Sequence, residues 1–315
     1  MTTRRWTVGL DVGGTKAHAV LLDDGVPHAS VRVTTGRRLE GVVAAALEAI
    51  DDLCAPAGLT AADLAGVGIG VPGIVDPAAG TVSHAVNLGI DAAAVPLGAV
   101  LSERLGGVPV AVENDLTVAT LGAAEVLRVD DVALLAMGTG MAAGLVLGGK
   151  VRRGFRGGAG EVGHLLFRPD GPRCACGQRG CLELYGSGSA LDAAWTSRSG
   201  RPAPVEVFEA ATAGDPEAVA VRDVFVDAVA TAVRVIALTV DVEYIVLGGG
   251  VAGVGAPMLA AVSEALSRQA VTSPFLAHMA IPERLRLTPT GVPVAPIGAA
   301  RAAADRFERE SSWRS

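Results

Sequence analysis

The stretch from Gly157 to Glu183, GGAGEVGHLLFRPDGPRCACGQRGCLE, constrains the chain most strongly, because it gathers side chains that bind metals. Three of the four cysteines in the sequence fall within eight residues, and a histidine lies ten residues before the first of them. Three thiolates and one imidazole fill the tetrahedral shell of a structural zinc ion and leave no position open for water. The predicted zinc ligands are His164, Cys174, Cys176 and Cys181. We expect this zinc loop, residues 164–181, to hold the neighbouring Glu161 and Glu183 in place; the alternative is a zinc loop whose flanking acids are incidental.

Length and composition favour an α/β protein. A chain of 315 residues is long enough for about two domains of ordinary size. Half of the residues are hydrophobic but only 3% are aromatic, which suits helices packed closely on sheets. The formal charge of −7 argues against a nucleic-acid partner, since neutralising phosphates needs a concentrated basic patch. Arg152, Arg153 and Arg156 form a basic cluster that is too small to change this prediction.

The sequence also predicts a cytoplasmic protein without a membrane partner. Two uncharged runs, 132–149 and 244–263, are interrupted by glycines and therefore indicate buried strands rather than spanning helices. The N-terminus has no apolar stretch of signal-peptide length. With three thiols grouped as metal ligands and Cys54 alone, a disulfide framework is not expected, and a reducing compartment follows.

The first half of the chain predicts a mixed sheet. Residues 6–33 alternate short apolar runs with turns, which indicates a meander of three strands before a helix at 39–53. Strands and helices then alternate at 67–71, 97–105, 108–113 and 116–127. Strand, helix and strand in succession imply parallel strands joined by crossovers.

The second half begins with the same pattern. VALLAMGTGMAAGLVLGGKV repeats the strand, glycine turn and strand of TVGLDVGGTKAHAVLLDD. Helices are predicted at 187–198, 204–213, 215–240 and from Pro257, with a strand at 244–250. We therefore expect two related lobes with a hinge near 115–130. Residues 1–115 with 297–315 are assigned to a smaller N-terminal lobe, which the C-terminal helix returns to cover, and 116–296 to a larger lobe with the zinc loop.

The first glycine turn, Asp11-Val12-Gly13-Gly14-Thr15-Lys16, has the composition of an anion-binding hairpin. Its glycines allow backbone N–H groups to approach a phosphate, and Thr15 and Lys16 add side-chain donors. Asp11 carries the wrong charge for a phosphate and is better suited to a hydrated Mg²⁺ ion. The spacing does not match a Walker loop, and a plain hairpin turn remains the alternative.

Two further glycine turns follow buried strands. They are Gly138-Thr139-Gly140, after Met137, and Gly248-Gly249-Gly250. Each is weak evidence alone, but three such turns at strand ends together predict a nucleotide site.

An acid also follows a strand in Glu113-Asn114-Asp115, at the sheet edge where α/β proteins bind ligands. Asp115 can take the proton of a hydroxyl, and Asn114 offers both a donor and an acceptor to a polyol. Because Asn and Asp are also favoured at helix N-termini, a capping role is the alternative.

These motifs together resemble the ROK family of bacterial sugar kinases and sugar-responsive repressors. The resemblance runs from about residue 7 to 303 and rests on DVGGTK, VGIGVPG, END, MGTG, GLVLGGKVRRGFRGGAGEVGH, CACGQRGCLE and VLGGGV. It implies an actin-like ATPase fold of the ribonuclease-H-like kind, with two α/β lobes and an interlobe cleft for ATP and a hexose. It also implies a dimer or tetramer.

The resemblance implies roles for individual residues. Asp115 would be the catalytic base, and the sugar hydroxyls would be held by Asn114, Asp115, Glu161, His164 and Glu183. ATP and Mg²⁺ would be held by Asp11, Gly13, Gly14, Thr15, Lys16, Gly138, Thr139, Gly140, Gly248, Gly249 and Gly250. One nitrogen of His164 would bind zinc and leave the other to donate to the sugar. The family's usual GTGxGGG is GTGMAAG here, and alanines at 142 and 143 lack the freedom of glycine at positive φ.

The sequence thus favours an ATP-dependent hexose kinase acting on the 6-hydroxyl, with glucose first. N-acetylmannosamine, N-acetylglucosamine, fructose, allose or an aminosugar are alternative substrates. A sugar-responsive regulator is less favoured, because the first strand starts near residue 6 and leaves no room for a helix-turn-helix domain, and an idle sugar-binding protein would need a defective Asp115 or DVGGTK turn.

Overall fold

The structure is a computed structural model that describes residues 5–312, with side chains as far as Phe307. The chain forms two compact units, divided between Arg128 and Val129 and again between Thr288 and Pro289. The first unit therefore combines the N-terminal part of the chain with its C-terminal helix. Each unit is built around one five-stranded sheet.

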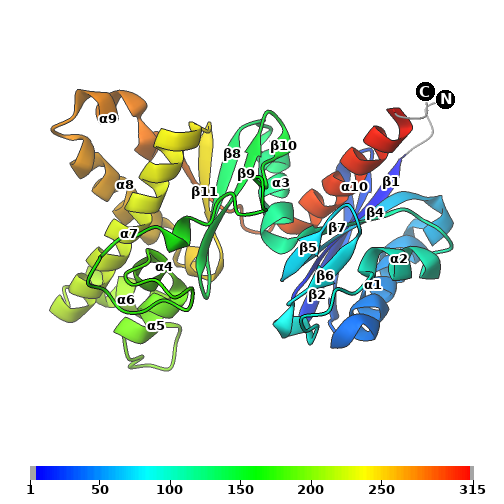
Figure 1. The fold of residues 1–315 in the computed structure, drawn as a ribbon, viewed down its shortest axis with the longest axis horizontal. Helices are drawn as coiled ribbons and strands as arrows, with labels where there is room; N and C mark the ends of the chain where they lie inside the picture. Colours follow the sequence, from blue (N-terminus) through cyan, green and yellow to red (C-terminus); the bar gives the residue numbers. More distant parts are fainter. Residues whose placement is uncertain (1–4, 313–315) are drawn as a thin grey trace. The chain divides into compact units, whose positions relative to one another are not determined.

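The first unit contains the predicted meander. Strands β1 (Trp6–Val12), β2 (Lys16–Asp23) and β3 (Val26–Thr34) pair antiparallel, and β4 (Leu64–Val71) and β7 (Val110–Asn114) add parallel to β1. The order across the sheet is β3-β2-β1-β4-β7 (Figure 1). Asp24 and Gly25 both have positive φ, as a tight hairpin between β2 and β3 requires. A small hairpin of β5 (Ile74–Asp76) and β6 (Thr81–Ser83) follows β4.

Helices cover both faces of this sheet. On one face lie α1 (Arg38–Cys54) and α2 (Leu97–Arg104), and on the other lies α10 (Val294–Ser312), with α3 (Asp115–Leu127) packed against it (Figure 1). Glycines in the strands let α10 approach closely. A β-carbon added at Gly9 would lie 1.9 Å from the carbonyl oxygen of Pro296, and one at Gly68 would lie 1.7 Å from that of Ala299. The C-terminal helix thus returns to the first unit, as predicted.

The sheet of the second unit repeats the first, strand for strand. It contains β8 (Val132–Met137), β9 (Met141–Leu147), β10 (Lys150–Val151), β11 (Tyr244–Gly248) and β12 (Leu285–Leu287). The order is β10-β9-β8-β11-β12, an antiparallel meander extended by two parallel strands, as in the first unit. The predicted duplication of a hairpin-led α/β unit is confirmed by this topology.

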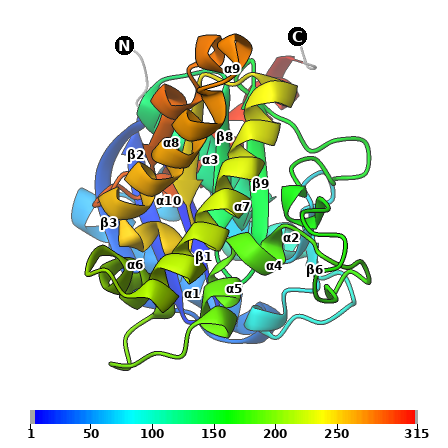
Figure 2. The same cartoon turned by 90° about the vertical axis from the view of Figure 1, so that its left-hand side faces the viewer.

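The helices of the second unit are α4 (Glu183–Gly186), α5 (Gly188–Ala194), α6 (Ala203–Thr212), α7 (Pro216–Val240), α8 (Ala256–Ala270) and α9 (Pro274–Met279). The long α7 lies beside α8 (Figure 2). The single helix predicted at 187–198 is wrong, because α5 ends at Ala194. Beyond it, the backbone N–H groups of Arg198 and Ser199 donate to the buried carboxylate of Glu206, which draws the chain out of the helix.

The unit boundaries also differ from the expected ones after residues 115 and 296. Helix α3 belongs to the first unit because it packs on α10 through two glycines. A β-carbon at Gly122 would lie 1.7 Å from the Val294 carbonyl oxygen, and one at Gly298 would lie 1.8 Å from that of Val118. The chain leaves the first unit only after α3, at Arg128, whose φ of 57° ends the helix.

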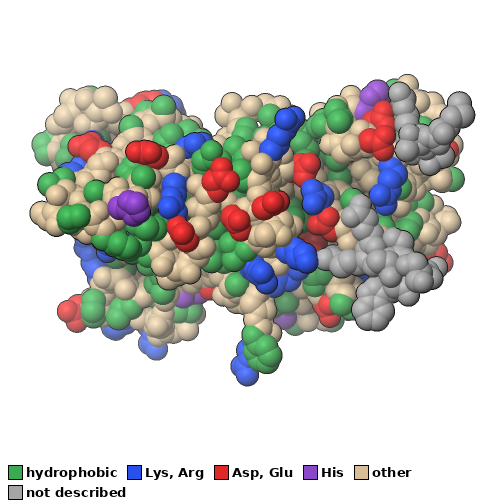
Figure 3. Space-filling view, turned by 90° about the horizontal axis from the view of Figure 1, so that it is seen from above, with side chains coloured by type: hydrophobic (Ala, Val, Ile, Leu, Met, Phe, Trp, Pro, Cys, Tyr) green, Lys and Arg blue, Asp and Glu red, His purple; other side chains and the backbone are tan. Residues whose placement is uncertain are grey.

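The surface carries charges of both signs. On the face drawn in Figure 3, Lys and Arg side chains are interspersed with Asp and Glu side chains. Within residues 5–312, no helix combines the length and the apolar character needed to cross a membrane.

Candidate active site and metal centre

The DVGGTK turn of the first unit connects β1 to β2. The backbone N–H of Gly13 donates to the carbonyl oxygen of Lys16 at 3.0 Å and closes the turn. Gly14 packs tightly, since a β-carbon there would lie 3.0 Å from the carbonyl oxygen of Asn87, which would have to move by a few tenths of an ångström. The side chains of Thr15 and Lys16 are exposed and therefore available to a ligand.

Two acids of the first unit, Asp11 and Asp115, are partly buried, and the charge of Asp115 acts on Asp11. Asp11, near the end of β1, is in register with Gly70 on β4, and Gly70 is in register with Glu113 on β7. Asp115 lies two residues beyond Glu113, at the start of α3. Burial raises the pKa of Asp11 to about 6, and the negative charge of Asp115 adds to this increase. Burial likewise raises the pKa of Asp115, although hydrogen bonds from the Leu116 N–H and the Asn114 side chain act in the opposite direction.

Asn114 caps helix α3. Its Oδ1 accepts from the Leu116 N–H at 3.0 Å, and its Nδ2 donates to the Gly73 carbonyl oxygen at 3.2 Å. The capping role is therefore present in the structure. The two hydrogens of Nδ2 serve Gly73 and Asp115, so the second lone pair of Oδ1 is the group of Asn114 that can still accept from a hydroxyl ligand.

In the second unit, the two remaining glycine turns lie next to each other. The turn 138–140 follows β8, and the turn 248–250 follows β11, which pairs parallel with β8. A β-carbon at Gly249 would lie 2.5 Å from the Met137 carbonyl oxygen, and its φ is 81°, so glycine is required there on both grounds. Both turns thus lie at the carboxyl ends of neighbouring parallel strands, where α/β sheets bind ligands.

The alanines that replace the expected glycines fit without strain. Ala142 and Ala143 lie on β9, opposite Ala136 and Leu135 of β8. Neither alanine has positive φ. The two alanines of GTGMAAG therefore belong to a regular strand, and the turn 138–140 before them keeps both of its glycines.

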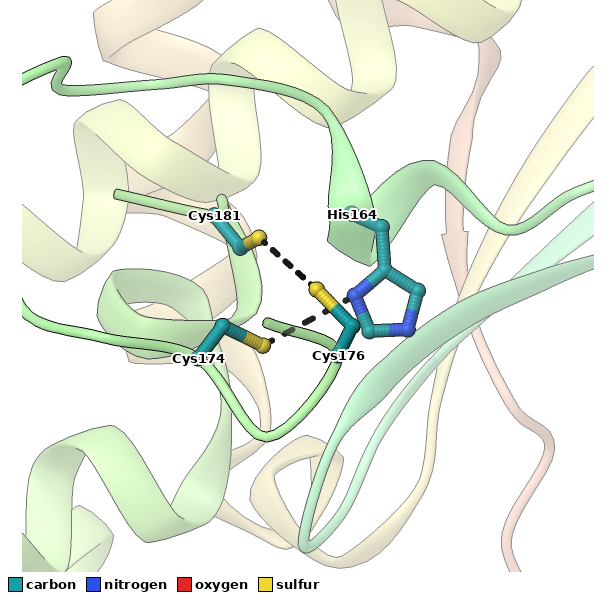
Figure 4. A group of neighbouring side chains, drawn as sticks. All are labelled: His164, Cys174, Cys176 and Cys181. Carbon is teal, nitrogen blue, oxygen red and sulfur yellow. Dashed lines mark hydrogen bonds between the residues drawn. The ribbon is translucent and has the colours of Figure 1, made fainter. Parts of the chain in front are cut away.

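The four predicted metal ligands come together in the loop between β10 and α4. The Sγ atoms of Cys174, Cys176 and Cys181 and a ring nitrogen of His164 all lie within 4.8 Å of one another, and the side chains point inward (Figure 4). The sulfurs of Cys176 and Cys181 are 3.6 Å apart, and Cys174 Sγ is 3.9 Å from His164 Nδ1. A tetrahedral ion with metal–sulfur bonds of about 2.3 Å places its sulfur ligands about 3.8 Å apart. These four residues therefore fit a metal ion.

Two acids flank this cluster. Glu183, the first residue of α4, has Oε1 at 3.0 Å from Cys174 Sγ and 3.6 Å from His164 Nδ1. Glu161 has Oε2 at 3.9 Å from His164 Nε2, and its side chain is 58% exposed. The imidazole therefore turns Nδ1 toward the sulfurs and Nε2 toward Glu161. The structure thus places Glu161 and Glu183 on either side of His164, and their role in sugar binding stays a prediction.

Three residues beside these groups were not predicted from the sequence. Asn87, exposed on a 3-10 turn (Val86–Leu88), lies against Gly14. Gly188 donates its N–H to the Gly138 carbonyl oxygen at 2.7 Å and supports that turn. Gln178 contacts the metal cluster. The glycine repeat at 186–188 could have indicated the second of these, whereas no sequence signal singles out the other two.

Most of the chain resembles known proteins. The model of the ROK family matches residues 7–300. A glucokinase of Halalkalibacterium halodurans is 32% identical over 81% of this chain and 83% of its own, and an N-acetylmannosamine kinase of Haemophilus influenzae is 30% identical over 78% and 80%. The ROK hexokinase from Thermus thermophilus has a TM-score of 0.76 at 32% identity, covering 96% of this chain and 99% of that one. A ROK family glucokinase from Streptomyces griseus, solved with glucose and AMPPNP, has a TM-score of 0.71 at 31% identity, covering 95% and 99%.

These likenesses confirm the predicted fold class, an actin-like ATPase fold of the ribonuclease-H-like kind built from two α/β units. In this chain, the fold is seen in the two sheets of the same strand order and in the glycine turns after β1, β8 and β11. The chain belongs to the ROK family.

Proposed function

We propose that this protein phosphorylates the 6-hydroxyl of a hexose, with glucose as the preferred acceptor and ATP as the donor. The observation that carries the proposal is the pair of partly buried acids, Asp11, which begins the DVGGTK turn, and Asp115, whose charge acts on Asp11. Phosphoryl transfer needs an oriented hydroxyl and neutralised phosphate charge more than covalent catalysis. A partly buried carboxylate with a raised pKa suits the first task, and a glycine turn with a lysine suits the second.

Asp115 is the general base in this proposal. Its place at the first turn of α3 fixes the carboxylate, because Oδ1 accepts from the Leu116 N–H at 2.8 Å. The raised pKa of Asp115 makes the carboxylate a stronger base, which favours proton abstraction from a hydroxyl. Asn114, already fixed by its capping bonds, would orient the same sugar.

The donor would be held by the glycine turns. Backbone N–H groups at 13–14 and 138–140, with Thr15 and Lys16, would bind phosphate oxygens, and the turn 248–250 would adjoin the nucleotide. Asp11 would hold Mg²⁺ through water, and the ion would supply charge neutralisation when bound. The raised pKa of Asp11 fits this role, since a buried carboxylate near a second one is stabilised by a cation.

The metal of the His164–cysteine cluster is proposed to be a structural zinc ion. Three thiolates and one imidazole are soft ligands that favour zinc, and they complete its shell. Nδ1 of His164 would bind zinc, so Nε2 would carry the proton and donate to a sugar hydroxyl. Glu161 and Glu183 would accept from neighbouring hydroxyls.

The test of function is a hexose panel. The purified protein with ATP and Mg²⁺ should release ADP in the presence of glucose and form the 6-phosphate, which phosphorus NMR identifies. A protein that phosphorylates none of the hexoses would contradict the proposal. N-acetylmannosamine is the second candidate acceptor, favoured by the similarity to the N-acetylmannosamine kinase, and the ratio of kcat/KM values decides between them.

Two further properties belong to this proposal. A dimer or tetramer is expected, and light scattering of the purified protein would measure it. A cytoplasmic location is expected because zinc-binding thiols need a reducing compartment.

A further inference from the structure

Gln178 contacts all four residues that form the metal cluster. Its backbone carbonyl accepts from the Cys174 N–H at 2.8 Å, and its backbone N–H donates to the sulfur of Cys176. Its side-chain Nε2 donates to the His164 carbonyl oxygen at 2.8 Å and to Cys181 Sγ at 3.2 Å. The backbone contacts are available to any residue, but the side-chain contacts need an amide.

The two side-chain contacts select the NH₂ end of the amide. A carbonyl oxygen can only accept, and the sulfur of Cys181 is an acceptor once it is a thiolate bound to a metal. One NH₂ group has two hydrogens and can serve both. A carboxylate of the same shape at position 178 could serve neither and would place negative charge against the thiolate.

These contacts join two segments of the loop. His164 lies ten residues before Cys174, and the amide of Gln178 links its main chain directly to the sulfur of Cys181. Backbone pairing also holds the segments, since the Leu182 N–H donates to the Leu165 carbonyl oxygen at 2.9 Å. The pairing fixes the strand-like part of the loop, whereas the amide bond acts on the ligand residue itself.

We propose that Gln178 is a positioning residue that fixes His164 relative to the cysteines, so that Nδ1 faces the metal and Nε2 faces the hexose. This inference rests on the proposed function for the role of Nε2. Hydrogen bonds to metal ligands orient them and commonly change metal affinity by about 10- to 100-fold when removed. Gln178 hydrogen-bonds to a ligand sulfur and to the main chain of the ligand histidine, so it should affect both the orientation of His164 and the affinity for the metal.

The experiment compares Gln178→Glu, which keeps the shape, with Gln178→Leu, which removes the polar group. The control is Gln269→Glu on α8, because Gln269 already accepts from Arg234 Nη1 at 3.2 Å and a carboxylate preserves that bond. Zinc-loaded proteins are mixed with the chelator 4-(2-pyridylazo)resorcinol, and the rate of zinc release is measured. The KM values for glucose and ATP are measured with zinc in excess, and circular dichroism checks folding.

Gln178→Glu should release zinc about tenfold faster or more, with Gln178→Leu between it and the wild type. With zinc in excess, its KM for glucose should still rise several-fold while the KM for ATP stays unchanged. The control should remain within about twofold of the wild type in every value. Equal zinc release and equal glucose KM in Gln178→Glu and the control would overturn the inference.

Faster release with an unchanged glucose KM would also overturn it, because the amide would then only anchor a sulfur. If the wild-type protein phosphorylates no hexose, the proposed function fails independently. The zinc-release rates and the ¹⁵N chemical shifts of the His164 ring nitrogens then test whether Gln178 positions His164. A second set of His164 ring signals in Gln178→Glu supports it, and wild-type signals with wild-type release rates refute it.

Discussion

Glu183 fills the space beside Gly140, so that a β-carbon at position 140 would lie 2.9 Å from Glu183 Oε2. The other carboxylate oxygen of Glu183 lies 3.6 Å from His164 Nδ1. One side chain therefore links the turn after β8 to the metal cluster. In the proposed kinase, this contact joins a residue of the donor site to a residue of the acceptor site.

Gly140→Ala should therefore impair both substrates. The added methyl group displaces the carboxylate of Glu183, so the KM values for glucose and ATP should both rise. We expect kcat/KM to fall on the order of tenfold, which corresponds to about 1.4 kcal/mol of lost transition-state stabilisation. Steady-state kinetics with each substrate varied would measure this. Gly253→Ala is the control, because no atom lies within 4 Å of a β-carbon there and its φ is not positive. A change confined to the KM for ATP would argue that Glu183 takes no part in sugar binding.

Asp115→Asn tests the general base. The variant keeps the side-chain oxygen that accepts from the Leu116 N–H, so the fold and the KM for glucose should change little. Loss of proton abstraction should lower kcat by about 10²- to 10⁴-fold. Asp52→Asn, at an exposed position of α1, serves as the control. Turnover near the wild-type rate in Asp115→Asn would contradict the assignment.

The pKa of Asp11 predicts a pH-dependent stability. Because burial and the charge of Asp115 raise this pKa from 3.8 to about 6, the folded state holds the proton more tightly than the unfolded state. The stability from the protonated form is fully present below pH 3.8 and is lost as the pH rises through about 6. The difference between these two pKa values corresponds to about 3 kcal/mol of stability.

Asp11→Asn removes this dependence. In the presence of EDTA, the variant should gain up to about 3 kcal/mol in free energy of unfolding over the wild type at pH 8, and the gain should vanish near pH 4. Urea unfolding at several pH values gives this difference. If the free energies of unfolding of the two proteins differ by a constant amount from pH 4 to pH 8, the Asp11 carboxylate does not carry the raised pKa.

The sequence predicted what local patterns determine. Alternating apolar residues and glycine turns located both hairpin-led sheets, and cysteine spacing located the metal cluster. The end of α5 at Ala194 was not predicted, because it depends on Glu206, a carboxylate that reaches back along the chain. The influence of Asp115 on Asp11 depends on strand register across β4, and the role of Gln178 depends on how a loop folds back on itself. Neither relationship leaves a periodic pattern.

The metal cluster gives the last prediction. Cys176→Ala removes one of four ligands, so the purified variant should lose the zinc that elemental analysis would find at one ion per wild-type chain. Without the ion, the loop carrying Glu161, His164 and Glu183 must order itself when the sugar binds, which weakens binding. The KM for glucose should therefore rise by about tenfold or more, since each 1.4 kcal/mol of ordering free energy is a factor of ten.

Cys54→Ala, at the buried cysteine of α1, should keep both the zinc and the KM for glucose. The turns 138–140 and 248–250 are continuous with the paired strands β8 and β11, and Glu183 is the contact between the first of them and the cluster, so the KM for ATP should change less than the KM for glucose. A zinc-free Cys176→Ala protein with an unchanged KM for glucose would show that packing alone holds the loop, because the acids and His164 would then keep their places without the ion.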